Sequence, residues 1–521
     1  MQQNSPNGAH TLIRSLTDAG VEVCLANPGT SEMHMVEAID GTPALRPVLC
    51  LFEGVCTGAA DGYGRMRGAP AMTLLHLGAG LGNGIANLHN ARRAGTPLVN
   101  VIGEHAVHHV PYDAPLTADI EGIARPVSSW VRTSRTADSL GDDAWDAVAA
   151  ALTPRPDPAG SIATLVVPAD CAWGPGRPAP SNRSLPQRYR AFDDAAVASV
   201  AAAGLDAGTL LLMDGNALTE AGVRAAGRLA ARTGCRVLTT TFPARVDSGP
   251  GLPAIGRLPY FPEQIREVLS GVSTLVLVGA QAPVSFFAYQ QQPSDLVPAD
   301  TRVLRLAHRH EDGAGALAAL ADDLGAGAEG PVVTAVRPEL PGGALSTRSV
   351  SEILAALAPD DCIVASDSGG GGAAVPAMQR SVRHAWLHLT GGAIGQGGPA
   401  AVGAALACPD RTVFALLGDG GAMYTNQFLW TAAREQLKVV TVVYRNRRYG
   451  ILDVEYRRLG INEVGERAAS LFDLSRPDID WVALAASQGV PGARADTCED
   501  FAAALGRALA SDGPYLIEAV V

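Results

Sequence analysis

The chain has 521 residues, of which 47% are hydrophobic and 18% are charged, and this length predicts about three domains. The formal net charge of −12 argues against nucleic acid or an anionic membrane as the main partner. Lys438 is the only lysine among the 40 lysine and arginine residues, which nearly excludes chemistry that depends on a catalytic lysine or on a Walker A loop.

The cysteines are scattered and form no Cys-x-x-Cys pair, so a disulfide framework is not expected. The first residues lack the basic segment and the apolar core of a signal peptide. No uninterrupted apolar run reaches about 18 residues, the length that a membrane helix needs. We therefore expect a soluble cytoplasmic protein without a membrane partner.

Two segments rich in proline and glycine are expected to be linkers, and they divide the chain into predicted domains at 1–175, 190–330 and 345–521. In each domain, short apolar runs alternate with helical patterns, which predicts three α/β domains with parallel sheets. The runs expected to form strands are 21–25, 47–51, 71–75, 97–102, 209–213, 236–238, 274–278, 302–306, 362–365, 412–417, 438–444 and 515–520. Ligands in such folds bind at the carboxyl ends of the strands.

In the first domain, two polar residues occupy such positions. Glu53 follows an apolar run and opens a predicted helix, where it is either an acid–base group or a carboxylate favoured by the helix dipole. His76 ends the strand 71–75 and precedes a glycine-rich segment, so it is either a proton-transfer group or an ordinary capping or core histidine. That segment lacks a full Gly-x-Gly-x-x-Gly pattern, which makes dinucleotide binding a weak interpretation.

In the third domain, the strand 412–417 continues into Gly418-Asp419-Gly420-Gly421, and the strand 438–444 continues into Arg445 and Asn446. Asp419 and Asn446 are therefore expected at the carboxyl ends of consecutive parallel strands. The glycines leave room for a phosphate, and a carboxylate with an amide oxygen suits Mg²⁺. The alternative for each motif alone is a turn and a cap; together they favour a diphosphate–metal site.

Asp419 in Gly418-Asp419-Gly420 precedes Asn446 by 27 residues, and this spacing resembles the diphosphate signature of thiamine diphosphate enzymes. Further segments are similar to the decarboxylase/carboligase group of that family. They are Asn27-Pro28-Gly29-Thr30, Glu53 with Ala60-Asp61-Gly62-Tyr63-Gly64-Arg65, and Gly391-Gly392-Ala393-Ile394-Gly395. The chain is most similar to acetolactate synthase large subunits, and benzoylformate decarboxylase is a close second because of residues 75–83. The resemblance implies a pyrimidine-binding, a central and a diphosphate-binding domain, in that order.

The resemblance also implies roles for individual residues. Asp419, Asn446 and the backbone carbonyl of Arg448 would hold Mg²⁺. Glu53 would protonate the pyrimidine of thiamine diphosphate, and His76 would handle protons of the reacting substrate. The other residues expected around the cofactor are Thr30, Gly369, Gly370, Gly392, Ile394, Gly420, Gly421, Tyr449 and Ile451, with the Gly392 carbonyl accepting from the aminopyrimidine and Ile394 wedging the cofactor into a bent shape.

The sequence departs from the family pattern at Arg445, where an asparagine is usual, and Arg447 and Arg448 follow Asn446. These arginines either grip phosphate or an anionic substrate, or are partly solvated. A second catalytic histidine of the decarboxylases is missing around residues 249–251.

The histidines His105, His108 and His109 are candidates to replace that missing histidine. The central domain also lacks the segment found near the flavin of acetolactate synthases, so FAD is not expected.

The implied function is thiamine diphosphate- and Mg²⁺-dependent decarboxylation of a 2-oxo acid with carboligation to a second carbonyl compound. The alternatives are a benzoylformate-type decarboxylase or lyase and a non-catalytic cofactor-binding paralogue. Because Glu53 and Asp419 of the family meet across a subunit interface, we expect a homodimer or homotetramer with a shared active site.

Overall fold

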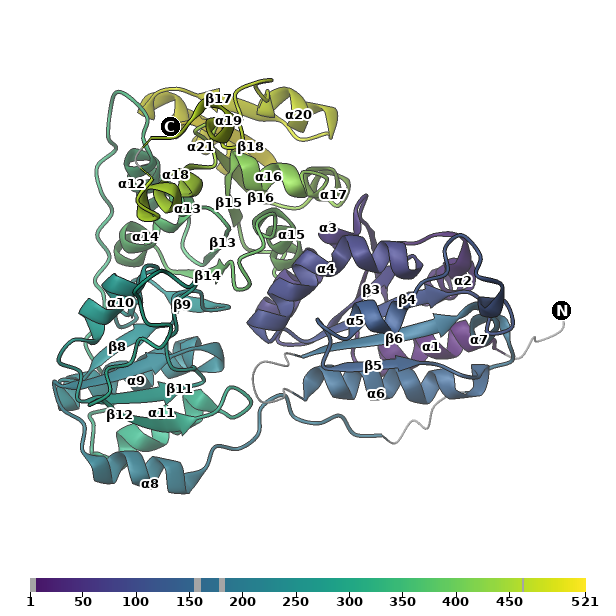
Figure 1. Cartoon of the computed structure of the whole chain (residues 1–521), viewed down its shortest axis with the longest axis horizontal. Helices are drawn as coiled ribbons and strands as arrows, with labels where there is room; N and C mark the ends of the chain where they lie inside the picture. Colours follow the sequence, from purple (N-terminus) through teal and green to yellow (C-terminus); the bar gives the residue numbers. More distant parts are fainter. Residues whose placement is uncertain (1–5, 154–160, 178–182, 462) are drawn as a thin grey trace.

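The computed structural model describes residues 6–153, 161–177, 183–461 and 463–521, and it contains three sheets, each packed with helices (Figure 1). Every one of the predicted apolar runs overlaps a strand, and the strands of each sheet are parallel apart from one edge strand of the third. The prediction of α/β domains with parallel sheets is therefore confirmed. No helix among the described residues has the length and apolar character that crossing a membrane requires.

The first sheet has six strands in the order β2-β1-β3-β4-β6-β5. Its strands are β1 (Val23–Asn27), β2 (Arg46–Leu49), β3 (Ala71–Leu75), β4 (Leu98–Glu104), β5 (Trp130–Thr133) and β6 (Ile162–Pro168). Its helices are α1 (Gly8–Asp18), α2 (Met33–Asp40), α3 (Glu53–Arg67), α4 (Leu77–Ala94), α5 (Ile120–Ala124), α6 (Leu140–Leu152) and α7 (Ala169–Trp173).

The central sheet has five strands in the order β10-β8-β7-β11-β12. Its strands are β7 (Thr209–Met213), β8 (Arg236–Thr239), β10 (Gly256–Arg257), β11 (Thr274–Val278) and β12 (Arg302–Ala307). The helices of this part are α8 (Asp194–Ala203), α9 (Glu220–Thr233), α10 (Pro262–Leu269) and α11 (Gly313–Asp323). Residues 331–340 then run without helix or strand toward the third sheet.

The third sheet has seven strands in the order β17-β18-β16-β15-β13-β14-β9. Its strands are β9 (Val246–Ser248), β13 (Cys362–Ser366), β14 (His384–His388), β15 (Val413–Gly418), β16 (Val439–Arg445), β17 (Gly492–Ala495) and β18 (Tyr515–Val520). Its helices are α12 (Thr347–Leu357), α13 (Gly369–Gly372), α14 (Val375–Ser381), α15 (Gly397–Ala407), α16 (Asp419–Tyr424), α17 (Phe428–Arg434), α18 (Gly450–Arg458), α19 (Glu466–Ala469), α20 (Trp481–Ser487) and α21 (Cys498–Ala510).

Strand β9 belongs by sequence to the predicted central domain but lies in the sheet of the third. It comes from the middle of the chain but pairs with β14 as an antiparallel edge strand, with Val246 opposite Trp386. The central part of the chain is thereby attached to the third sheet by a backbone ladder. The domain boundaries predicted from the sequence stay predictions.

Helices α3 and α15 join the first and third sheets in one apolar core (Figure 1). Small residues allow the two helices to approach closely. A Cβ on Gly62 would lie 2.1 Å from the carbonyl oxygen of Ala400, and a Cβ on Gly403 would lie 1.8 Å from that of Ala59. Because both positions lack a side chain, α3, whose first residue is Glu53, packs directly on α15.

Candidate active site

Asp419 and Asn446 lie at neighbouring strand ends of the third sheet. β15 and β16 pair in parallel, with Gly418 opposite Tyr444, and each polar residue directly follows the last residue of its strand. Asp419 is 4% exposed and accepts hydrogen bonds from the backbone N–H groups of Gly420 (2.9 Å) and Arg447 (2.6 Å). Burial raises the pKa of Asp419, since removal from water disfavours the ionised form, and the backbone hydrogen bonds oppose this effect.

The donor atoms at this edge fit a hard divalent cation. Asp419 offers a carboxylate, and Asn446 is exposed, with its Oδ1 accepting from the N–H of Arg448 at 3.0 Å. The carbonyl of Arg448 accepts from the N–H of Gly450 at 3.0 Å and retains a second lone pair. Among the described residues no cluster of three His, Cys, Asp or Glu side chains could hold a metal. A metal here would depend on amide and backbone oxygens, as Mg²⁺ sites commonly do.

Glycine backbone surrounds the same strand ends. Gly369 and Gly370 open α13, whose N-cap Ser368 accepts from the N–H of Gly371, and no atom lies within 4 Å of a Cβ placed on Gly369. Gly420 lies under the ring of Tyr449, because a Cβ there would be 2.2 Å from the ring. Gly369 is exposed and Gly370 is partly buried, whereas Gly420 is buried and its N–H donates to Asp419. The backbone at Gly369 and Gly370 is therefore accessible to an anion such as a diphosphate.

Three further residues expected around the cofactor occupy different elements. Gly421 packs beside Asp367, whose Oδ1 is buried without a described partner. Thr30 is exposed and begins a short 3-10 helix, Thr30–Glu32. Ile451 lies on α18 and is 50% exposed. The structure therefore places these residues on exposed or glycine-rich segments.

Glu53 is held by helix α4. It is the first residue of α3 and is 7% exposed. Its Oε2 accepts a hydrogen bond from Nδ2 of Asn83 at 3.0 Å, and its Oε1 would lie 3.2 Å from a Cβ on Gly80. The carboxyl group is thus fixed at the carboxyl-end edge of the first sheet, where the sequence predicted it.

His76 forms a pair with Glu32, a residue that the sequence analysis missed. Nδ1 of His76 lies 2.8 Å from Oε2 of Glu32, which is 0% exposed and also accepts from the N–H of Gly29 at 2.7 Å. Gly103 leaves the space that the carboxylate occupies, since a Cβ there would lie 1.7 Å from Oε1 of Glu32. Leu77, next to His76, has a φ of 49°, which is strained for a leucine and is typical of functional sites.

The three arginines near Asn446 have separate partners. Arg445 is buried and bonds to Glu518 (3.0 Å) and to Asp478. The side chains of Arg447 and Arg448 are 43% and 47% exposed, respectively. Arg448 pairs with Asp453, and Arg447 lies 3.7 Å from Asp478. Each of the three therefore has a carboxylate of this chain as a neighbour.

The candidate replacement histidines make contacts mainly with one another. The rings of His105 and His109 meet edge-on at 5.3 Å, and His108 lies 3.8 Å from Asp170. No hydrogen bond or ion pair between described residues joins these histidines to Glu53 or His76. Their role as a second catalytic histidine stays a prediction.

The loop of residues 390–395, which carries Gly392 and Ile394, contacts both the first and the central part of the chain. Gly392 has a φ of 78° and is exposed, and a Cβ on it would lie 3.0 Å from the ring of Phe286. Ile394 is partly buried, and its neighbour Ala393 is hydrogen-bonded to Asn90 of α4.

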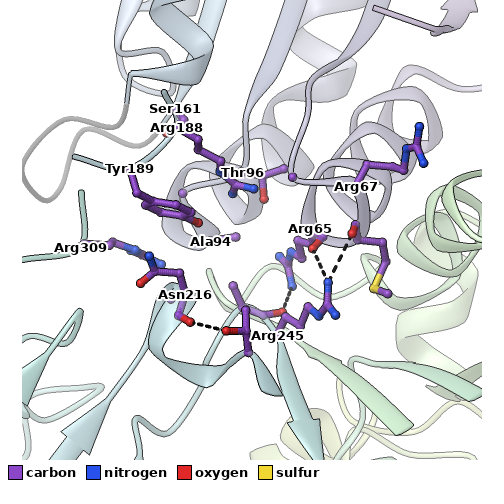
Figure 2. A pocket seen from close by; sticks show the side chains of 16 residues that line it. Arg65, Arg67, Ala94, Thr96, Ser161, Arg188, Tyr189, Asn216, Arg245 and Arg309 are labelled. Atoms are coloured by element: carbon purple, nitrogen blue, oxygen red, sulfur yellow. Dashed lines mark hydrogen bonds between the residues drawn. The ribbon is translucent and has the colours of Figure 1, made fainter. Parts of the chain in front are cut away.

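Two cavities lie between the parts of the chain. One of about 250 Å³ is lined by arginines from α3 and from the central part, and Figure 2 shows Arg188, Arg245 and Arg309 around it. The other, of about 390 Å³, is bordered by Phe286 and other aromatic side chains of the central part and by the loop that carries Gly392. Neither cavity is lined by Glu53 or Asp419.

Three α/β domains with polar side chains at the carboxyl ends of their parallel strands define the class of α/β proteins that bind ligands at these ends. Residues 6–123 match the N-terminal and residues 370–519 the C-terminal TPP binding domain of thiamine pyrophosphate enzymes. IlvX of Mycobacterium tuberculosis, which carries the provisional name of an acetolactate synthase large subunit, is 50% identical over 99% of both chains. The chain therefore belongs to the thiamine pyrophosphate enzymes.

Other relatives agree with this assignment. Benzoylformate decarboxylase of Pseudomonas aeruginosa is 29% identical over 96% of both chains. A solved structure of a thiamine diphosphate-dependent 4-hydroxybenzoylformate decarboxylase from Rhodococcus jostii RHA1 is similar with a TM-score of 0.85 and 25% identity, covering 99% of both chains. The predicted resemblance to both acetolactate synthases and benzoylformate decarboxylase is confirmed, and the protein is an enzyme of the thiamine diphosphate-dependent decarboxylase or carboligase kind.

Proposed function

We propose that the protein decarboxylates a 2-oxo acid with thiamine diphosphate and Mg²⁺. Asp419, Asn446 and the carbonyl of Arg448 hold the metal, and the glycines at 369, 370, 420 and 421 surround the diphosphate. The hard oxygen donors at one sheet edge and the exposed backbone at Gly369 support this arrangement. When bound, thiamine diphosphate supplies the electron sink that loss of carbon dioxide requires.

Glu53 and the loop of residues 390–395 are assigned to the pyrimidine end of the cofactor. Glu53 shares a proton with a ring nitrogen, and the carbonyl of Gly392 accepts from the exocyclic amine. Burial of Glu53 supports this role, because a carboxyl group sheltered from water exchanges its proton with a bound partner rather than with solvent. Ile394, Tyr449 and Thr30 complete the walls of the proposed cofactor site.

The pair of His76 and Glu32 is the observation that carries the proposal. Buried Glu32 accepts from Nδ1 of His76, which fixes the ring and its tautomer. No described residue forms a hydrogen bond with Nε2 of His76. In this tautomer Nε2 holds the lone pair, so it can take up a proton from water and pass it to the product carbon. Proton delivery releases an aldehyde, which favours simple decarboxylation.

The side chain of the substrate is proposed to be aromatic. Phe286 beside Gly392 packs against Phe242 and Tyr260, with ring centroids 5.7 and 5.3 Å apart. An aryl 2-oxo acid would contact such aromatic edges favourably. The similarity to enzymes named for benzoylformate and 4-hydroxybenzoylformate supports the same class.

Carboligation to a second carbonyl compound is the second candidate, because IlvX, with 50% identity, bears an acetolactate synthase name. A non-catalytic paralogue is disfavoured by the intact Glu53 and by the pair of His76 and Glu32. FAD is not proposed as a cofactor, and the cytoplasm is the proposed compartment.

We also propose a homodimer or homotetramer in which Glu53 of one chain meets Asp419 of another. Apolar side chains near both residues support it: Leu51 is 48% exposed, Met423 is 40% exposed and Ile451 is 50% exposed. Adjacent apolar residues of this kind are typical of surfaces that a partner covers.

The test is to supply benzoylformate and pyruvate separately to the protein with thiamine diphosphate and Mg²⁺, and to measure carbon dioxide, aldehyde and acyloin. Benzaldehyde from benzoylformate is expected. Acyloin as the main product would favour carboligation, and cofactor binding without turnover of any 2-oxo acid in a panel would favour the paralogue.

Glu53→Gln tests the acid–base role directly, because glutamine keeps the hydrogen bond to Asn83 but cannot share the proton. We expect turnover to fall by at least about 10²-fold while calorimetry still detects the cofactor. Turnover equal to that of the wild type would refute the role.

A further inference from the structure

The loop of residues 390–395 cannot fix its own conformation. It contains Gly391, Gly392 and Gly395, and the last two have φ values of 78° and 91°. Glycines lose much conformational freedom when they are held in one geometry, so an ordered loop of this composition needs outside contacts.

Asn90 of α4 holds the middle of the loop, while Asp367 and Thr425 hold its end at Gly395. Its Nδ2 donates to the carbonyl of Ala393 at 2.8 Å, and its Oδ1 accepts from the N–H of the same residue at 3.3 Å. Its backbone carbonyl accepts from Oγ1 of Thr390 at 2.7 Å. Gly391 also packs on this side chain, since a Cβ there would lie 2.6 Å from Oδ1 of Asn90.

The side chain of Asn90 is itself fixed. It is 0% exposed, and Nδ2 also donates to Oδ1 of Asn87 at 3.0 Å. Asn87 in turn donates to the carbonyl of Gly54 at 2.8 Å, next to Glu53. The hydrogen-bond chain therefore starts where α3 begins and ends at the peptide groups of Ala393.

We propose that Asn90 is a positioning residue that sets the Gly392 carbonyl and the Ile394 side chain for the aminopyrimidine of the cofactor. Ala393 lies between these two residues, so fixing both of its peptide polar groups fixes the orientation of its neighbours. This inference rests on the proposed function. Asn90 acts through the loop and does not touch the cofactor.

Asn90→Asp is the sharpest test, because aspartate has nearly the same shape and keeps the acceptor for the N–H of Ala393. It replaces the donor by an oxygen that repels the carbonyl of Ala393. Asn100→Asp is the matched control: Asn100 on β4 is also 0% exposed and bonds to Thr73 (2.6 Å) and Thr164 (3.2 Å), away from the loop.

For Asn90→Asp we expect faster amide hydrogen exchange at residues 390–395 and about tenfold weaker thiamine diphosphate binding by calorimetry, as loss of one buried hydrogen bond predicts. We expect kcat to fall while the KM for the 2-oxo acid changes less than twofold. Asn100→Asp should lower Tm comparably, with exchange in the loop and cofactor affinity unchanged.

Unchanged cofactor affinity in Asn90→Asp would overturn the inference and leave the proposed function intact. Equal loss of affinity in both variants would also overturn it, since a general structural effect would then suffice. If the wild-type protein bound no thiamine diphosphate with Mg²⁺, both the proposed function and the inference would fall.

Discussion

Glu32 shows how a single buried carboxylate depends on two missing side chains. It occupies space that a Cβ on Gly103 would fill, and it takes a hydrogen bond from the backbone of Gly29. A Cβ on Gly29 would also lie 2.2 Å from Nδ1 of His76. The pair of His76 and Glu32 therefore requires glycine at both positions.

Gly103→Ala should push Glu32 away from His76 and release the ring. We expect turnover of the 2-oxo acid to fall by about 10²-fold, the lower range for a lost general acid–base group. Steady-state kinetics measures the effect. Gly506→Ala in α21, where no atom lies within 4 Å of the added Cβ, should leave turnover unchanged; an equal effect of the two substitutions would contradict the steric argument.

Arg445 is expected to stabilise the fold, since it bonds to buried Glu518. Arg445→Met would leave that carboxylate unpaired, at a cost of about 3–5 kcal/mol in the free energy of unfolding. Arg448→Met removes an exposed pair with Asp453 and should leave the free energy of unfolding nearly unchanged. Urea unfolding followed by fluorescence compares the two variants, and equal losses would show that burial of the pair is unimportant.

At the scale of elements, β14 carries two buried histidines. Burial lowers the pKa of His384 to about 4 and that of His388 well below its usual value, because water no longer stabilises the charged rings. Asp247 acts in the opposite direction on His384, whereas Arg383, Arg411 and, near His388, Arg257 and Arg65 act in the same direction as burial.

The free energy of unfolding should therefore decrease as the pH falls. Between pH 6.5 and about 4 the histidines of the unfolded chain bind protons, whereas those of folded β14 stay neutral. Each histidine therefore lowers the free energy of unfolding by up to about 1.4 kcal/mol for each pH unit of acidification. Above pH 6.5 this contribution to stability is complete. Urea midpoints at pH 7 and pH 5 should differ less for His384→Asn than for the wild type, and identical pH dependence would refute the assignment.

Apolar strands such as β3, β7 and β11 could be predicted to the residue, because continuous apolar runs of this length are too short for a buried helix. β14 was not expected because histidine alternates with its apolar residues. β9 and β10 have three and two residues, too few to show a pattern. Their existence depends on distant partners that local sequence does not reveal.

The same distinction holds for the candidate site. Asp419 and Asn446 could be predicted to share a sheet edge, since each follows an apolar run and consecutive parallel strands are commonly neighbours. Glu32 could not, because its burial depends on Gly103, distant in sequence. The signal available in the sequence was the position of Glu32 two residues after Asn27-Pro28-Gly29-Thr30, a segment that resembles the family.

At the scale of the whole molecule, β9 makes the third sheet dependent on the central part of the chain. A fragment of residues 345–521 would lack β9 and would expose the edge of β14. We expect this fragment to self-associate, as sedimentation would show, and a fragment of residues 190–521, which keeps β9 and the whole central sheet, to associate less. A monomeric 345–521 fragment would show that the edge needs no cover.

The pairing of β9 also constrains the order of events during synthesis on the ribosome. Val246 emerges long before Trp386, its partner on β14. Until the nascent chain has passed residue 388, this short strand has no place in any sheet, although β7 and β8 beside it in sequence can already pair. β9 can therefore pair only after β14 in the C-terminal third of the chain has been synthesised.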